Sequence, residues 1–146
     1  MVRDFKARNF EVRVAEGEIP MHRSRLAGFI IDCNTDDLEQ AAQFWSAALG
    51  RSLVPRDQEP NPKYRCMQTV PEELHIEVQQ VSHDSRVHLD IEADDVQAEV
   101  RRLEALGARR IGNVGTWCVM EAPTGQRFCV VRVQRGGFEE NANRWT

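Results

Sequence analysis

Residues 87–95, VHLDIEADD, and residues 29–37, FIIDCNTDD, share one pattern: an apolar run with an aspartate inside it and an Asp-Asp pair at its end. Each stretch leads into a helical pattern that ends in Ala-Leu-Gly, at Gly50 in the first copy and at Gly107 in the second. The internal aspartates Asp32 and Asp90 are 58 residues apart, and the two glycines are 57 residues apart. Such a repeat indicates one domain built from two copies of a supersecondary unit.

The run in the second copy has the period of a strand. Val87, Leu89 and Ile91 alternate with the polar residues His88 and Asp90, and this period of two is expected of a strand with one dry face and one polar face. We therefore predict a half-buried strand here, and a similar strand in the first copy.

A helix is predicted after each strand. Asp36 and Asp94 are the expected N-caps, and Glu39 and Gln97 follow them at the spacing of a capping box. Apolar residues then recur on one stripe up to the closing glycine of each helix, so each helix needs a sheet against which to bury that stripe.

Short strand-like runs separated by turn residues follow each helix. They cover residues 52–54, 64–70 and 74–81 in the first half, and 109–111, 117–121 and 127–133 in the second. Each half therefore reads strand, helix and three strands. The expected fold is α+β, with two βαβββ modules whose curled mixed sheets surround a cleft and whose helices lie on the outer face.

This order resembles the vicinal oxygen chelate superfamily, which contains glyoxalases, bleomycin-resistance proteins and extradiol dioxygenases, and in particular its small glyoxalase-like domain proteins. The motifs that carry the resemblance are Phe44-Trp45 before Ala-Leu-Gly, the run from Arg86 to Asp90, the run from Leu103 to Ala108, and Ala122-Pro123-Thr124-Gly125 before the last strand. The resemblance implies paired modules around a shared cleft, often in a dimer, with small-molecule binding or chemistry inside. It does not imply a substrate.

The expected organisation is a domain over residues 26–134, made of modules 26–81 and 86–134. Residues 1–25 form an N-terminal extension that an added strand, a dimer-embracing arm or disorder would each explain, and residues 135–146 form an unassigned C-terminal tail. Open sheets with edge strands, together with the extension, favour a homodimer.

Composition excludes several classes of protein. The net charge is -4 with acidic and basic residues interspersed, which is unlike a nucleic-acid binder. The sequence has no apolar stretch long enough for a membrane helix and no apolar region of a secretory signal near its N-terminus. The four cysteines show no close pairing motif, so reduced thiols in the cytoplasm are expected.

Metal enzymes of the superfamily usually carry their ligands on the first and last strands of the two modules, all pointing into the cleft. The resemblance places His88, Glu77 and Cys129 at three of these positions, while the fourth falls on Ile30 or Gly28, which have no ligating side chain. His75 lies on the same face as Glu77 and offers another nitrogen. The candidate ligands for a divalent Zn, Ni, Fe or Mn ion are therefore Glu77, His88, His75 and Cys129, in an incomplete set, and a protein without a metal is the other expectation.

Each of these residues also has a structural interpretation. His88 is expected to point into the cleft with Glu77 as its nearest carboxylate, or else to be a satisfied histidine bonded to Glu77 or Asp90. The cysteines are expected to be small core residues. Trp117 either joins the core or turns its indole toward a ligand in the cleft.

Two classes of function follow from these residues, with a plain dimeric scaffold as a third. One is an enzyme, a lyase, isomerase or dioxygenase, in which Glu77 is catalytic and His88 holds a metal or substrate. The other is a small-molecule-binding protein with an incomplete metal site, similar to antibiotic-sequestering relatives, in which His88, Trp117 and Asp90 contact the ligand.

Overall fold

The computed structural model describes residues 21–146, and the expectations for residues 1–20 lie outside this range. The helical elements are α1 (Leu38–Leu49), the 3₁₀ turn η1 (Arg56–Gln58), α2 (Val96–Ala105) and α3 (Phe138–Asn141). The strands are β1 (His22–Asn34), β2 (Tyr64–Cys66), β3 (His75–Val81), β4 (Arg86–Ala93), β5 (Arg109–Val114), β6 (Trp117–Glu121), β7 (Arg127–Arg132) and β8 (Asn143–Trp145).

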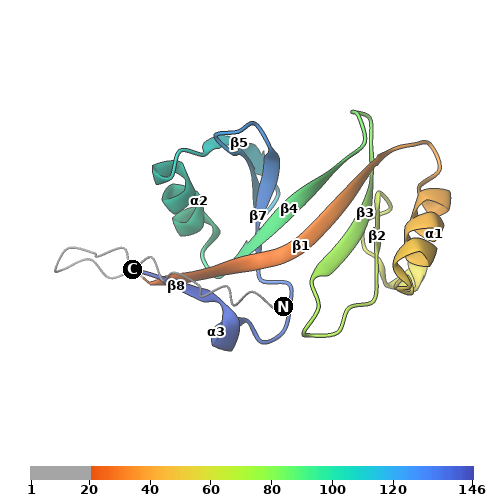
Figure 1. Cartoon of the computed structure of the whole chain (residues 1–146), viewed down its shortest axis with the longest axis horizontal. Helices are drawn as coiled ribbons and strands as arrows, with labels where there is room; N and C mark the ends of the chain where they lie inside the picture. The colour runs from red at the N-terminus through yellow and green to blue at the C-terminus, as the bar shows by residue number, and fades with distance from the viewer. Residues whose placement is uncertain (1–20) are drawn as a thin grey trace, which may run out of the picture.

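All eight strands belong to one mixed sheet. Its order is β2-β3-β1-β4-β7-β6-β5, and β8 pairs with β1 outside this path. The two halves meet where β1 and β4 run antiparallel, while β1 with β3 and β4 with β7 are parallel pairs. Ile30 pairs with His88 at this seam, so the equivalent positions of the two copies are direct neighbours. The α+β fold with two related halves is confirmed (Figure 1).

The second half follows the expected strand, helix, three strands, and the first half departs from it at one point. Residues 52–54 form only an isolated bridge, between Leu53 and Met67, in place of a regular strand. Pro55 follows directly and has no N–H with which to continue the ladder, which explains the short pairing.

Both helices begin one residue later than predicted. The N-caps are Asp37, whose side chain accepts from Gln40 N, and Asp95, whose side chain accepts from Ala98 N. Asp94 instead accepts a hydrogen bond from the backbone N–H of Arg23, across to β1. The second aspartate of each pair therefore has the capping role, so the predicted capping boxes are wrong in register.

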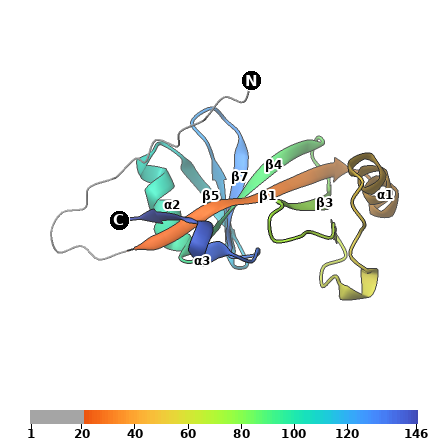
Figure 2. The same ribbon diagram turned by 60° about the horizontal axis from the view of Figure 1, so that its bottom comes forward.

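The helices cover the face of the sheet opposite the cleft. α1 packs on β2 and β3 over a core that includes Ile31 and Val78, and α2 packs on β5, β6 and β7 over Cys118 and Val130. The two helices lie at opposite ends of the sheet (Figures 1 and 2). Because strand side chains alternate, the residues next to these core positions point to the other face.

The C-terminal segment is part of the folded structure. β8 pairs with the first residues of β1, and Trp145 donates its indole N–H to Ser24 Oγ at 2.7 Å. Phe138 is buried, with the Arg25 guanidinium over its ring. Trp145 and Phe138 therefore attach the C-terminal segment to β1. Within residues 21–146, no helix has the length and apolarity needed to cross a membrane.

Candidate functional site

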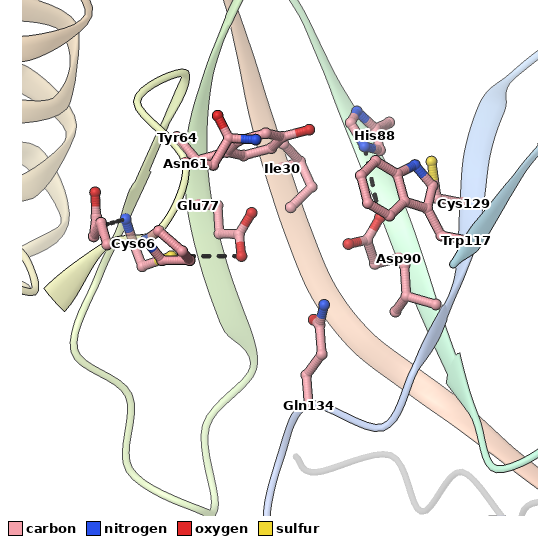
Figure 3. Close-up of a pocket in the computed structure, with 13 residues that line it drawn as sticks. Ile30, Asn61, Tyr64, Cys66, Glu77, His88, Asp90, Trp117, Cys129 and Gln134 are labelled. Atoms are coloured by element: carbon pink, nitrogen blue, oxygen red, sulfur yellow. Dashed lines mark hydrogen bonds and ion pairs between the residues drawn. The ribbon is translucent and has the colours of Figure 1, made fainter. Parts of the chain in front are cut away.

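A cavity of about 230 Å³ lies on the face of the sheet away from α1 and α2. Its walls come from both halves of the chain (Figure 3). The lining residues are Ile30, Glu59, Pro60, Asn61, Tyr64, Cys66, Glu77, His88, Asp90, Trp117, Cys129, Val131 and Gln134.

The strand register decides which side chains meet in this cavity. Ile30 on β1 pairs with Glu77 on one side and with His88 on the other. Figure 3 accordingly shows Glu77 on one wall and His88 with Asp90 on the opposite wall. The alternation found in the sequence thus placed the side chains of Glu77, His88 and Asp90 on the correct face.

His88 is held by two aspartates of the central strands. Its Nδ1 lies 2.7 Å from Asp32 Oδ2, and its Nε2 lies 3.6 Å from Asp90 Oδ1. Because a carboxylate oxygen accepts hydrogen bonds, Nδ1 donates to Asp32, and Nε2 is left on the side of Asp90. The expectation that Glu77 would be the carboxylate nearest to His88 is wrong, since Asp32 is brought beside His88 by the pairing of β1 with β4.

Both aspartates are buried and incompletely satisfied. Asp32 is 2% exposed and Asp90 is 6% exposed, and the Oδ1 atom of each is buried without a hydrogen-bond partner among the described residues. The 3.6 Å separation from His88 is an ion-pair distance, too long for a hydrogen bond. Burial raises the pKa of Asp90 to about 6, against the opposing effect of His88, and Glu77 adds to the rise. Perturbed buried carboxyl groups of this kind mark candidate functional sites.

The opposite wall holds a second cluster of polar side chains. Glu77 Oε1 lies 2.5 Å from His75 Nε2 and accepts a hydrogen bond from the Cys66 thiol at 3.5 Å. Burial raises the pKa of the Cys66 thiol, and the nearby Glu77 carboxylate raises it further. The prediction that Cys66 is a small core residue is wrong, because its pairing with Glu77 turns it into the cavity.

The other three cysteines lie in or beside the core, as predicted. Cys118 is fully buried in the core under α2, and Cys33 packs against the core under α1. Cys129 is 8% exposed and also borders the cavity, where burial followed by the charge of Asp90 raises the pKa of its thiol to about 12. Trp117 lies in the cavity lining on the same wall.

The ligand arrangement implied by the superfamily does not fit these residues. Ile30 occupies one of its four positions, and His88 does not share a group with Glu77. Instead, side chains with metal-ligating atoms form two separate groups within residues 21–146, each with its ligand atoms within 4.8 Å of one another. One group is Cys66, His75 and Glu77, and the other is His88, Asp90 and Cys129.

Three residues of the site were missed as candidates from the sequence. Asp32 was recognised only as part of the repeat, although it shares a strand face with Ile30. Tyr64 and Cys66 share a face of β2, and Tyr64 accepts a hydrogen bond from Gln79 Nε2 at 2.8 Å. Burial raises the pKa of Tyr64 to about 12, with a further contribution from Glu77. Alternation was sufficient to place Asp32 on the same strand face as Ile30, but its contact with His88 depends on the pairing of β1 with β4. The positions of Tyr64 and Cys66 depend on the pairing of β2 with β3.

Comparison with known proteins agrees with this fold. Residues 28–131 match the family model described as glyoxalase-like domain. The hypothetical protein BH1468 from Bacillus halodurans C-125 is 14% identical, with 78% of this chain and 99% of that chain covered and a TM-score of 0.50. A methylmalonyl-CoA epimerase in complex with methylmalonyl-CoA and NH4+ is 14% identical over 75% of this chain and 95% of that chain, with a TM-score of 0.48.

A glyoxalase I mutant from Zea mays is 20% identical over 70% of this chain and 44% of that chain, with a TM-score of 0.26. No curated protein sequence matches the chain. At 14% identity the structure of BH1468 bears on the fold alone, and the family model covers most of the chain. The chain therefore belongs to the glyoxalase-like domain family.

Proposed function

We propose that this protein is an enzyme of the isomerase or lyase type that moves a proton on a small molecule bound in the cavity, with His88 as the general base. The observation that carries the proposal is the 2.7 Å hydrogen bond between the buried Asp32 carboxylate and Nδ1 of His88, a residue that lines the cavity. A base held in this way is oriented before the substrate arrives.

The geometry around His88 suits proton transfer. Asp32 fixes the ring and the tautomer, so the lone pair of Nε2 is available on the Asp90 side of the cavity wall. When Nε2 takes a proton from a C–H bond beside a carbonyl group, the ring becomes a cation flanked by Asp32 and Asp90. The electron pair of the broken bond moves onto the carbonyl oxygen. In a hydroxy ketone, His88 then returns the proton to the former carbonyl carbon while the hydroxyl proton passes to the oxygen that received the electron pair. In an elimination, the carbonyl re-forms as the bond to the leaving group breaks, and His88 gives the proton to that group.

The size of the cavity suits a small molecule. Its volume of about 230 Å³ is below the ~300–1,000 Å³ of pockets for drug-sized ligands. The wall opposite His88 carries the Glu77 carboxylate and the Cys66 thiol, which would accept a hydrogen bond from a hydroxyl group and donate one to a carbonyl oxygen of such a molecule. Hydroxy ketones of a few carbon atoms, which carry no charge, therefore have the chemistry and the size that this acidic cavity suits.

Solvent deuterium exchange tests this proposal directly. The purified protein is incubated in D2O with hydroxyacetone, and loss of the C–H signal beside the carbonyl is followed by proton NMR. We expect catalysed exchange by the natural protein and a decrease of at least ~100-fold for His88→Gln, the usual contribution of a positioned general base. Asp32→Asn should also lower the rate and should change the ¹⁵N shifts that report the His88 tautomer.

Stability measured on the same samples separates a catalytic from a structural His88. If His88 is the base, His88→Ala should abolish exchange in a protein that still folds, although the loss of the hydrogen bond to the buried Asp32 lowers the free energy of unfolding by about 1–3 kcal/mol. Unchanged exchange together with a large loss of stability would refute the proposed role.

A second candidate function is binding without catalysis. Trp117 on one wall and Tyr64 on the other offer aromatic faces, and acidic side chains lie beside them. Such a cavity suits a planar or cationic molecule. Tight binding of small aromatic cations, with no exchange in hydroxyacetone, would favour this function over the enzyme.

A further inference from the structure

Cys66, His75 and Glu77 converge on one point of the cavity wall. Glu77 Oε1 contacts both other side chains, at 2.5 Å from His75 Nε2 and 3.5 Å from Cys66 Sγ. The three ligand atoms all lie within 4.8 Å of one another. A nitrogen, a sulfur and a carboxylate oxygen are thus gathered around one small volume.

The backbone register holds this arrangement. Cys66 and Glu77 are direct partners in the antiparallel pair of β2 and β3, which puts their side chains on the same face at neighbouring positions. His75 is two residues before Glu77 on β3 and therefore shares that face. All three side chains are attached to paired strands, so the group is preorganised by the sheet.

We propose that Cys66, His75 and Glu77 bind a zinc ion. Cysteine sulfur, histidine nitrogen and a carboxylate oxygen are the ligands that zinc takes in proteins, and a site with three protein ligands leaves the fourth position open. Tetrahedral bonds of about 2.0–2.3 Å place ligand atoms about 3.3–3.7 Å apart, so small rotations of these side chains reach the required geometry.

The open position faces the cavity. Cys66 and Glu77 line it, and the side chains of His75 and Glu77 are 19% and 16% exposed, which gives the ion a way in. The bound ion would polarise the carbonyl oxygen of a substrate whose C–H bond faces His88. That use of the metal rests on the proposed function, whereas the binding of zinc does not.

This site differs from the arrangement implied by the superfamily, in which ligands come from both modules. Here all three ligands come from one module, and Ile30 and His88 take no part. His88 is instead committed to Asp32, which orients it as a base. The group of His88, Asp90 and Cys129 is the competing metal site, and it makes a different prediction about which cysteine binds.

Cobalt substitution in cysteine variants distinguishes the two groups, because each group contains a different cysteine. A Co²⁺–thiolate bond gives a charge-transfer band that an oxygen or nitrogen ligand does not. The probe is Co²⁺ added to the metal-free full chain, followed by displacement with Zn²⁺ and elemental analysis. We expect one ion per chain and a thiolate band. The band should be lost in Cys66→Ser and retained in Cys129→Ser, its matched control.

Two further variants complete the test. Glu77→Gln should weaken Zn²⁺ binding by at least ~10-fold, since it removes a charged ligand. His88→Gln should bind zinc normally even where it abolishes proton exchange, so failure of the proposed function leaves the metal result intact. Absence of metal binding, or a band that disappears in Cys129→Ser but persists in Cys66→Ser, would overturn the assignment.

Discussion

The buried carboxyl group of Asp90 should make this protein less stable at neutral pH than it would be without the charge. Its pKa is raised from 3.8 to about 6, mainly by burial, with His88 opposing the rise. One pKa unit corresponds to about 1.36 kcal/mol, so ionising this group in the folded state costs on the order of 3 kcal/mol relative to the unfolded chain. Asp90→Asn removes the charge at nearly constant shape and should raise the free energy of unfolding at pH 7 by about 1–3 kcal/mol.

The sign of the pH dependence follows from the same shift. Between pH 4 and pH 6 the folded state holds a proton on Asp90 that the unfolded state has released, so this group makes stability fall as pH rises. Carboxylates with lowered pKa have the opposite effect; Glu99, where hydrogen bonds from Arg102 and His22 outweigh burial, is one of them. The contribution of Asp90 is therefore read from the difference between the natural protein and the variant.

The assay is urea denaturation of both proteins from pH 4 to pH 8. The stability gained by Asp90→Asn should grow from near zero at pH 4 to its full value above pH 6. Asp84→Asn, at an exposed position, is the matched control and should show no such trend. A variant that is less stable at pH 7, or a difference that does not change with pH, would refute the reasoning. Retention of a costly charge in the cavity is itself expected of a group kept for function.

Three other predictions concern the sheet and the assembly. Gly28→Ala should lower the free energy of unfolding by about 3 kcal/mol or more in chemical denaturation, because a Cβ at Gly28 would lie 1.7 Å from the carbonyl oxygen of His75. The control is Gly112→Ala, where the added Cβ meets open space and should cost under about 1 kcal/mol. Equal effects of the two substitutions would contradict this prediction. Arg25→Ala should lower the free energy of unfolding by about 3 kcal/mol, because it removes a 2.7 Å ion pair from the fully buried Glu92. A loss below about 1 kcal/mol would contradict this, since it would show that the other partners of Glu92 stabilise its charge without Arg25. We also predict a homodimer, because strands β2 and β5 lie at the two open edges of the sheet, where a second copy could pair. Sedimentation at micromolar concentration tests this prediction, and finding only monomer would contradict it.

The sequence was sufficient to predict the fold because the repeat and the alternation are local signals. The period of two placed His88, Asp90 and Glu77 on the face that forms the cavity, and the helical stripes placed α1 and α2 on the other face. Contacts within the cavity depend on how distant strands pair, and no single sequence contains that register. For this reason the partnership of His88 with Asp32 was missed.

The cavity role of Cys66 and the fate of the C-terminal segment were missed for the same physical reason. Cys66 enters the cavity only because β2 pairs with β3, and Trp145 is ordered only because β8 pairs with the start of β1. The helix starts were wrong by one residue because two adjacent aspartates offer equally good caps. In the second copy, the tertiary contact of Asp94 with Arg23 leaves Asp95 as the cap.

The pairing of β8 with β1 brings two distant parts of the chain together, with His22 opposite Trp145. A short linker between these ends, in a chain without residues 1–20, would close the polypeptide into a ring with little change in its path. New ends could then be opened in the exposed turn between β3 and β4, at residues 82–85, so that the second module is synthesised before the first. Because the cavity depends on β1 lying beside β4 and not on their order of synthesis, such a circular permutant should form the same cavity.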